Sequence, residues 1–321
     1  MATANRWMIL VVLAAICLGG CADGADPSLG NGDTADEPEA TAMPWAYRLV
    51  LRRTPAVEGL KGIALGDDGR IYLASASGVT VFDGDWVQIG HMPTPGPVTA
   101  VAVGPEGRVF ATEKARVHVF GSDGTLVSSW GRAGEGHGEL GYVTGIAVHG
   151  VDVWLADAGN RALHHFDVTG DLVDSIAGRD ETTGQPRILC PSPYMDVAAG
   201  TDGEVMITNP GYWRVERYSR GGERLGYWGG QGTAPNRFPG CCNPTNLALS
   251  ADGYVVTAEK GRSPRVKVSD GQGQVLGIIG TEFFAPASAG MDLAVDAGGR
   301  VFVVDPAQGA VLVFERMAEE G

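Results

Sequence analysis

The chain has 321 residues, of which 44% are hydrophobic and 19% are charged, and this composition supplies enough apolar side chains for a full hydrophobic core. It contains 49 glycines, roughly twice ordinary usage, which without a collagen-like period indicate many tight turns and few long helices. The formal net charge of −14 argues against a nucleic-acid-binding surface, because such a surface needs an excess of basic side chains.

The first 20 residues have the pattern of a secretory signal. Arg6 precedes an apolar run of 12 residues, from Trp7 to Leu18, which is too short to span a bilayer. The run ends in the sequence LGGC, which resembles the lipobox of bacterial lipoproteins, in which the cysteine thiol carries the lipid. We therefore expect a signal peptide over residues 1–20 and lipidation of Cys21; the alternative is an ordinary secretory signal with an incidental cysteine.

Residues 21–44 are expected to form an acidic tether behind the lipid. Residues 22–44 carry six acidic and no basic side chains and almost no large apolar ones, so they cannot bury enough surface to offset chain entropy. The lipoprotein resemblance also bears on location, because Asp directly after the lipidated cysteine favours inner-membrane retention, whereas Ala22 follows here. We expect an extracytoplasmic, membrane-anchored protein, with the outer membrane favoured if the cell has one.

From residue 45 onward the chain consists of six related units, and this repetition predicts the fold. Each unit has four short strands, with a glycine turn after the first strand, a polar loop after the second and a glycine turn after the third. The units begin at Gly62, Ala100, Gly145, Asp196, Asn246 and Asp292. Alternating apolar residues and Asp-Gly turns indicate antiparallel hairpins, and four-stranded units of this length are typical of propeller blades.

The sixth unit ends near Phe314 without a fourth strand. Residues 45–53 precede the first unit, have the pattern of a strand, and can supply the missing one. We therefore predict an all-β, six-bladed β-propeller over residues 45–321, closed by an N-terminal strand. Such closure leaves few strand edges exposed.

The units resemble NHL-repeat propellers over about residues 55–316. The likeness is carried by VDVWLADAGNRALHHFDVTGD, which begins at Val151, and by SSWGRAGEGHGELGYVTGIAV, which begins at Ser128. A closer likeness is to bacterial extracytoplasmic NHL proteins with the motifs GCCNPT, AEKG and PRVKV, here at residues 240–245, 258–261 and 264–268. The resemblance implies a six-bladed propeller but leaves function open, because NHL propellers include peptide-amidating lyases, sugar-lactonase relatives and binding modules.

Three cysteines remain after the expected lipidation site: Cys190, Cys241 and Cys242. Cys190 and Cys241 precede the fourth and fifth units by similar distances, so they should approach each other in adjacent blades. The first expectation is a disulfide between Cys190 and one of the pair. An alternative is a redox-active disulfide between Cys241 and Cys242. A third is soft-metal binding, with the shell completed by His91, His137, Met195 or Met291.

Polar residues begin the inner strands of the last three units: Asp196, Asn246 and Asp292. If this column faces the central channel, two carboxylates and an amide converge there, and oxygen ligands of this kind suit a hard cation such as calcium. The lactonase relatives place a divalent cation on the propeller axis with similar ligands, which supplies an analogy. The alternative, which we favour, is that these residues bind water and satisfy backbone groups.

A second set of polar residues ends the second strands. Its acidic members are Glu113, Asp157, Glu259 and Asp305, and the equivalent positions in the first and fourth units are Ser75 and Asn209. In NHL repeats this acid braces the following loop and meets its basic residue, here for example Asp157 with Asn160-Arg161 and Glu259 with Lys260 or Arg265. Structural bracing is therefore expected; the alternative is acid/base catalysis by one member if burial raises its pKa.

The sequence lacks a G-x-S-x-G elbow, a P-loop and an H-E-x-x-H motif, so it assigns neither catalytic nor metal-binding residues. His164 and His165 are adjacent on an expected strand and should point to opposite faces, which makes them a poor metal pair. We expect a lipid-anchored binding or scaffolding module whose protein or small-molecule ligand binds on the face of the inter-blade loops. The alternative is an enzyme: a lactonase-like metal-dependent hydrolase, or a thiol or copper redox protein.

Overall fold

The structure is a computed structural model and describes residues 43–286 and 288–318. The expected signal peptide, Cys21 and the expected tether up to residue 42 lie outside the described residues. Among the described residues, no helix is long and apolar enough to cross a membrane. Helix is confined there to three short 3₁₀ segments, at Pro105–Gly107, Pro210–Tyr212 and Thr281–Phe283.

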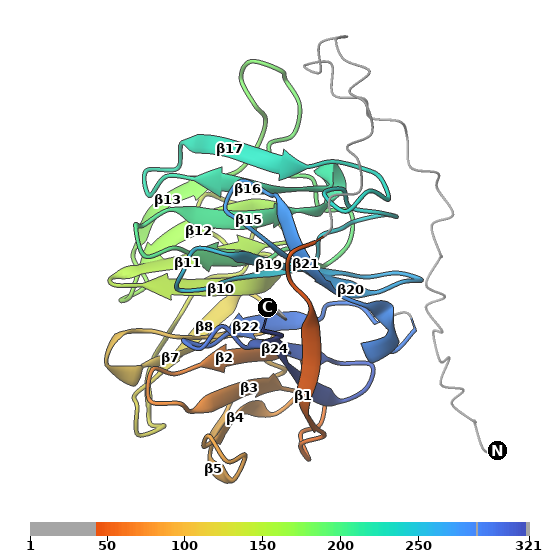
Figure 1. The fold of residues 1–321 in the computed structure, drawn as a ribbon. Helices are drawn as coiled ribbons and strands as arrows, with labels where there is room; N and C mark the ends of the chain where they lie inside the picture. Colours follow the sequence, from red (N-terminus) through yellow and green to blue (C-terminus); the bar gives the residue numbers. More distant parts are fainter. Residues whose placement is uncertain (1–42, 287, 319–321) are drawn as a thin grey trace, which may run out of the picture. The chain divides into compact units, whose positions relative to one another are not determined.

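Six antiparallel sheets of four strands make up the described chain, which confirms the predicted six-bladed β-propeller (Figure 1). We number the sheets as blades one to six in chain order. Blade one contains β2 (Gly62–Leu65), β3 (Ile71–Ser75), β4 (Gly78–Phe82) and β5 (Gln88–Pro93). Blade two contains β6 (Ala100–Val103), β7 (Val109–Glu113), β8 (Arg116–Phe120) and β9 (Leu126–Trp130). Blade three contains β10 (Val143–His149), β11 (Asp152–Asp157), β12 (Ala162–Asp167) and β13 (Leu172–Ile176).

The other three blades follow the same order, except that the last strand of blade six comes from the N-terminal part of the chain. Blade four contains β14 (Val197–Ala199), β15 (Val205–Asn209), β16 (Arg214–Tyr218) and β17 (Arg224–Gly229). Blade five contains β18 (Asn246–Leu249), β19 (Val255–Glu259), β20 (Arg265–Ser269) and β21 (Val275–Ile279). Blade six contains β22 (Asp292–Val295), β23 (Val301–Asp305), β24 (Ala310–Arg316) and β1 (Tyr47–Arg53).

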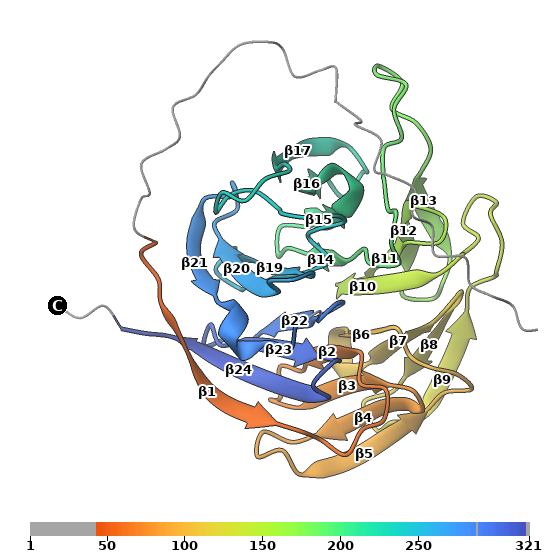
Figure 2. The same ribbon diagram turned by 90° about the vertical axis from the view of Figure 1, so that its right-hand side faces the viewer.

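The innermost strands of the blades form a closed ring. Each of β2, β6, β10, β14 and β18 contacts the next inner strand, and β22 contacts β2 (Figure 2). The apolar residues of facing sheets pack between blades; for example, Phe110 of blade two and Leu155 of blade three are fully buried in one cluster. The hydrophobic core is therefore divided among the interfaces between blades.

Strand β1 closes the ring as the sequence predicts. It pairs antiparallel with β24, from Tyr47 opposite Arg316 to Arg53 opposite Val311, with a register shift around Val50 (Figures 1 and 2). Leu49 packs against the core of blades five and six, whereas Val50 is 39% exposed. Blade six is thus completed by hydrogen bonds between segments that are far apart in the sequence.

Tight turns after the first and third strands depend on glycine. In the turn between β2 and β3, Gly69 has a φ of 81°, a left-handed conformation that residues with a Cβ rarely adopt. The turns of this kind lie on the side of the ring opposite to the connections between blades, because adjacent strands are antiparallel. We call the side that carries the inter-blade connections the loop face.

Candidate functional site

Asp196, Asn246 and Asp292 lie together where the inner strands of blades four, five and six begin, at the loop face. The Asn246 side chain donates a hydrogen bond from Nδ2 to Asp292 Oδ1 at 3.3 Å. Asp196 and Asp292 interact electrostatically, which places their carboxylates in one cluster. The sequence predicted this convergence. We call these three residues the channel cluster.

Both carboxylates of the channel cluster also fasten neighbouring blades. Asp196 Oδ2 accepts a hydrogen bond from the backbone N–H of Leu247 at 3.0 Å, from blade four to blade five. Asp292 Oδ2 accepts one from the backbone N–H of Ile63 at 2.8 Å, from blade six to blade one. The favoured expectation that these residues satisfy backbone groups therefore has direct contacts to support it.

Two glycines at the equivalent position make room for these carboxylates. A Cβ on Gly62 would lie 2.9 Å from Asp292 Oδ2, and a Cβ on Gly145 would lie 2.3 Å from Asp196 Oδ1. Both distances are too short for ordinary contacts. At the equivalent position, blades one and three therefore have a glycine that accommodates an acid, blade two has Ala100, and blades four to six have the three polar residues.

The environment of the channel cluster disfavours negative charge. Burial, reinforced by the nearby charge of Asp292, raises the pKa of Asp196 well above its ordinary value. Burial raises the pKa of Asp292 to about 6, although the Ile63 amide stabilises its charged form. A positive charge placed beside the two carboxylates would offset the cost of burying their negative charges.

Asn246 has one polar atom without a partner in the described chain. The residue is 9% exposed, and its Oδ1 is buried and makes no hydrogen bond to the described residues. A buried acceptor of this kind ordinarily has a protein or water partner. The channel cluster therefore offers two carboxylates and a carbonyl oxygen to a donor or a cation.

The predicted disulfide of Cys190 is absent from the structure, which has no disulfide among the described cysteines. Cys190 is buried and its thiol donates hydrogen bonds to Ser192 O at 2.8 Å and to Tyr194 O at 3.4 Å, so the loop before blade four satisfies it. The closest sulfur contact instead joins Cys241 and Cys242, with 2.9 Å between their Sγ atoms. Cys190 still lies near enough to Cys242 for their charges to interact.

The expected soft-metal shell does not assemble. Among residues 43–286 and 288–318, no three His, Cys, Asp or Glu side chains gather so as to hold a metal ion. Met195 and Met291 are buried in two different apolar clusters, and His91 Nδ1 pairs with Thr80 Oγ1 at 3.3 Å. Met195 shares its apolar cluster with Cys190, whereas Met291 belongs to another cluster.

Three polar residues at the ends of the second strands brace the loops: Asp157, Asp305 and Asn209. Asp157 accepts hydrogen bonds from the backbone N–H groups of Gly141, Tyr142 and Asn160 at 2.7–3.0 Å. Asp305 accepts from the Ala285 and Ala307 amides and from the Ser288 hydroxyl. Asn209 has the same role in blade four, where its side chain bonds the backbone of Arg187 and Leu189.

The sequence reasoning missed the main side-chain partners of this set, which lie on the third strand. Glu113 Oε2 lies 3.1 Å from His118 Nε2, Asp157 Oδ2 lies 3.5 Å from His164 Nε2, and Asn209 Nδ2 donates to Glu216 Oε1 at 3.0 Å. Four third-strand residues occupy equivalent positions: His118, His164, Glu216 and Lys267. Each lies opposite the second-strand residue that is two positions before the polar residue at the end of that strand. Four blades thus contain a polar pair, which is buried in blades three to five and partly buried in blade two.

Blade five contains a lysine in this position. The ammonium group of Lys267 forms an ion pair with Glu259, donates to the backbone O of Arg237 and lies 4.6 Å from the ring centroid of Phe238. Burial lowers the pKa of Lys267 to about 8, against the attraction of Glu259. Arg265 also pairs with Glu259, at 2.7 Å, as the sequence led us to expect. Lys260 instead places its ammonium over the ring of Tyr194.

His164 and His165 have separate partners, as expected for adjacent residues of a strand. His165 Nε2 contacts Asp152 Oδ1 at 2.8 Å and its ring stacks on Trp154, whereas His164 contacts Ser175. The two imidazoles therefore do not face a common site.

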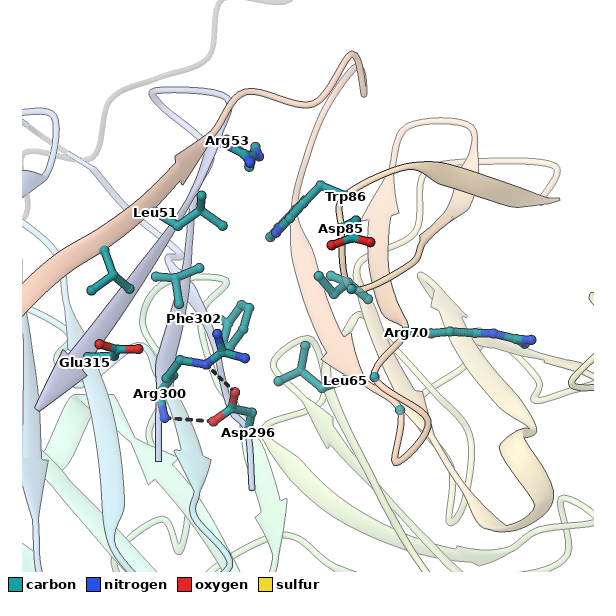
Figure 3. A pocket seen from close by; sticks show the side chains of 16 residues that line it. Leu51, Arg53, Leu65, Arg70, Asp85, Trp86, Asp296, Arg300, Phe302 and Glu315 are labelled. Atoms are coloured by element: carbon teal, nitrogen blue, oxygen red, sulfur yellow. Dashed lines mark hydrogen bonds and ion pairs between the residues drawn. The ribbon is translucent and has the colours of Figure 1, made fainter. Parts of the chain in front are cut away.

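A groove between blades six and one was not anticipated from the sequence. It has a volume of about 390 Å³, and Figure 3 shows Leu51 and Phe302 on one side and Trp86 and Leu65 on the other. Arg300 Nε forms an ion pair with Asp296 at 2.7 Å on its wall. The groove is lined by two regions that are far apart in the chain, residues 50–86 and 296–315, so no local pattern marks it.

The described chain thus belongs to the class of six-bladed β-propellers. Among solved structures it resembles a streptogramin B lyase, with a TM-score of 0.56 and 12% identity over 85% of this chain and 98% of the other. It also resembles the virginiamycin B lyase of Staphylococcus aureus, with a TM-score of 0.55 and 14% identity over 86% of this chain and 89% of the other. At these identities the likeness shows the fold alone.

No protein-family model matches the sequence, and the search of curated proteins found no match. The assignment to NHL repeats therefore stays a prediction. The propeller itself rests on the strand order and on the solved structures.

Proposed function

We propose that this protein is a lipid-anchored, extracytoplasmic NHL-type propeller that acts as a binding module in the cell envelope. The lipobox-like sequence ending at Cys21 and the acidic residues after it support the anchor. The strand order supports the propeller. The ligand binds on the loop face, at the channel cluster.

The observation that carries the binding site is the unpaired Oδ1 of Asn246 beside Asp196 and Asp292. All three side chains present oxygen acceptors, and the two carboxylates resist negative charge because they are buried close together. A ligand that brings positive charge or hydrogen-bond donors satisfies both requirements. We therefore propose a hard cation such as calcium, or a small molecule with an ammonium group, as the ligand class.

The loops around this site are held in place before a ligand arrives. Asp157 and Asp305 each bind several backbone and side-chain groups of the loops on the loop face. Such bracing reduces the entropy that ligand binding would otherwise remove from the loops. It supports a preformed binding surface.

Of the alternatives from the sequence, a thiol redox function has an observation of its own, the contact between Cys241 and Cys242. The copper alternative has no group of three His, Cys, Asp or Glu side chains among the described residues, and a hydrolase's cation would use the same channel cluster as the proposed binding module. The binding module therefore remains the main proposal.

The test is thermal melting of the purified protein during titration with calcium, magnesium or a small primary amine. A ligand that binds only the folded state raises the midpoint, by an amount equivalent to about 2.7 kcal/mol at 100 times its Kd. We expect one of these ligands to raise the midpoint of the unaltered protein and of Asp252→Asn, which changes an exposed carboxylate. The rise should be lost in Asp196→Asn and Asp292→Asn. An equal rise in all four proteins, or no rise with any ligand, would overturn the proposal.

A further inference from the structure

Two adjacent cysteines lie on the connection between blades four and five, at the loop face. Their Sγ atoms are 2.9 Å apart, about 0.9 Å more than the length of a disulfide bond, roughly 2.05 Å. Cys241 is exposed and Cys242 is buried, so the pair lies at the surface of the described chain. This arrangement differs from that of a cysteine that only fills a core.

The surrounding loop holds the pair from both sides. On the N-terminal side, Trp213 Nε1 donates to the backbone O of Gly240 at 2.8 Å. On the C-terminal side, Asn243 Nδ2 donates to Pro239 O at 2.7 Å and to Lys260 O at 3.0 Å, while its Oδ1 accepts from the Lys260 amide. The two thiols are thus kept adjacent by contacts to Trp213, just before β16, and to Lys260, just after β19.

The backbone between the sulfurs is itself unusual. Cys242 has a φ of 63°, in the left-handed region that residues with a Cβ seldom occupy. The contacts of Asn243 and Gly240 over-determine this conformation, and such conformations gather at functional sites.

Cys190, the third cysteine of the described chain, differs in reactivity from the Cys241–Cys242 pair. It is buried, its thiol is hydrogen-bonded to two carbonyl oxygens, and burial raises its pKa to about 11. A thiol of this kind is inert, because the thiolate is the nucleophile in exchange reactions. Cys190 therefore serves as an internal control for the other two.

We propose that Cys241 and Cys242 form a reversible dithiol–disulfide pair that exchanges electrons with an external disulfide. The Cys241 thiolate attacks one sulfur of the external disulfide, so a mixed disulfide forms and one external thiolate leaves. The Cys242 thiolate then attacks Cys241 Sγ, so the Cys241–Cys242 bond forms and the second external thiolate leaves. The pair loses two electrons and two protons, and the external disulfide becomes two thiols; the reverse steps reduce the pair.

The experiment incubates the full chain with oxidised glutathione, alkylates the remaining thiols under native and then unfolding conditions, and maps the cysteine peptides by mass spectrometry. We expect one peptide with an internal Cys241–Cys242 bond and no glutathione, and Cys190 alkylated only after unfolding. Dithiothreitol should restore both thiols. A bond from Cys190 to either neighbour, or two thiols that stay reduced, would overturn the proposal.

Two variants separate the exchange step from folding. Cys241→Ser alters an exposed side chain and leaves Cys242 without this partner, so the Cys241–Cys242 bond cannot form and any glutathione on Cys242 should persist. Cys190→Ser is the matched control and should form the Cys241–Cys242 bond at the rate of the unaltered protein. A glutathione adduct on Cys241 that persists in the unaltered protein would show that Cys242 does not complete the exchange, which would also overturn the proposal.

Discussion

The carboxylate of Asp292 accepts a hydrogen bond from the backbone amide of Ile63 at 2.8 Å, although 229 positions separate the two residues in the sequence. This contact fastens the inner strand of blade six to that of blade one. Outside it, β1 and β24 complete the same blade. The closure of the ring is thus secured near the channel as well as at the periphery.

Replacing Asp292 by Asn should change how stability depends on pH. Burial raises the pKa of this carboxyl to about 6 in the folded protein, above the ordinary value of about 4 in the unfolded chain. Its contribution to stability is therefore complete below pH 4 and is lost as the pH rises through 6. Asn carries no charge and still accepts from Ile63. The melting temperature of Asp292→Asn, relative to that of the unaltered protein, should therefore be about 3 °C higher at pH 8 than at pH 4.5.

The control for this experiment is Asp252→Asn, in which the carboxylate lies at the exposed turn before Tyr254. Its melting temperature should follow that of the unaltered protein across the same pH range. Parallel curves for Asp292→Asn would show that this carboxyl does not control the pH dependence.

The closing strand can be tested with two neighbouring side chains. Leu49→Ala removes apolar contacts with the core of blades five and six and should cost about 1–2 kcal/mol, less than a fully buried leucine because Leu49 is half-buried. Val50→Ala, at the exposed register shift, should change stability by less than about 0.5 kcal/mol. Urea unfolding measures both, and deletion of residues 45–53 should destabilise the whole ring. Equal effects at the two positions would contradict the packing of β1.

The buried ion pair between Glu259 and Lys267 in blade five predicts that removing the carboxylate alone costs more stability than removing both charges. Glu259→Gln leaves the Lys267 ammonium buried beside Arg265 without its counter-ion, and should cost about 3 kcal/mol or more. Adding Lys267→Met removes the stranded charge, so the double variant should be more stable than the single one. Guanidinium unfolding of the unaltered protein, Glu259→Gln and the double variant decides this, and a double variant less stable than Glu259→Gln would contradict it.

The anchoring proposal depends on one thiol that lies outside the described residues. Cys21→Ala should abolish lipidation, so the protein should leave the membrane fraction and appear as a precursor or a soluble form. Fractionation of cells that express each version provides the measurement. If the variant still fractionates with membranes, the chain is not a lipoprotein.

The fold was predictable because the repeated hairpins specify their own strands. Asp-Gly turns and alternating apolar residues mark strand ends locally, and the absence of a fourth strand after Phe314 pointed to residues 45–53. The channel cluster was predictable for the same reason, since equivalent positions in neighbouring blades converge toward the axis.

The remaining features depend on contacts that periodicity does not encode. Glu113 and Asp157 also contact His118 and His164, because the pleat places the third strand beside each acid. The predicted Cys190 disulfide was wrong because the loop before blade four turns its thiol toward local carbonyl oxygens. The equivalent positions of the cysteines in neighbouring units predicted that their sulfur atoms lie near one another, but not where each thiol points.

The pairing of Tyr47 with Arg316 also has a consequence for engineering. In the other five blades a tight turn joins the third strand to the fourth, as between β4 and β5. In blade six no turn joins the third strand, β24, to the fourth, β1. The ring therefore corresponds to a circular chain that is cut at one hairpin. Joining residue 316 to residue 47 by a short turn and cutting another blade at its third hairpin should therefore give circular permutants that keep every strand in place.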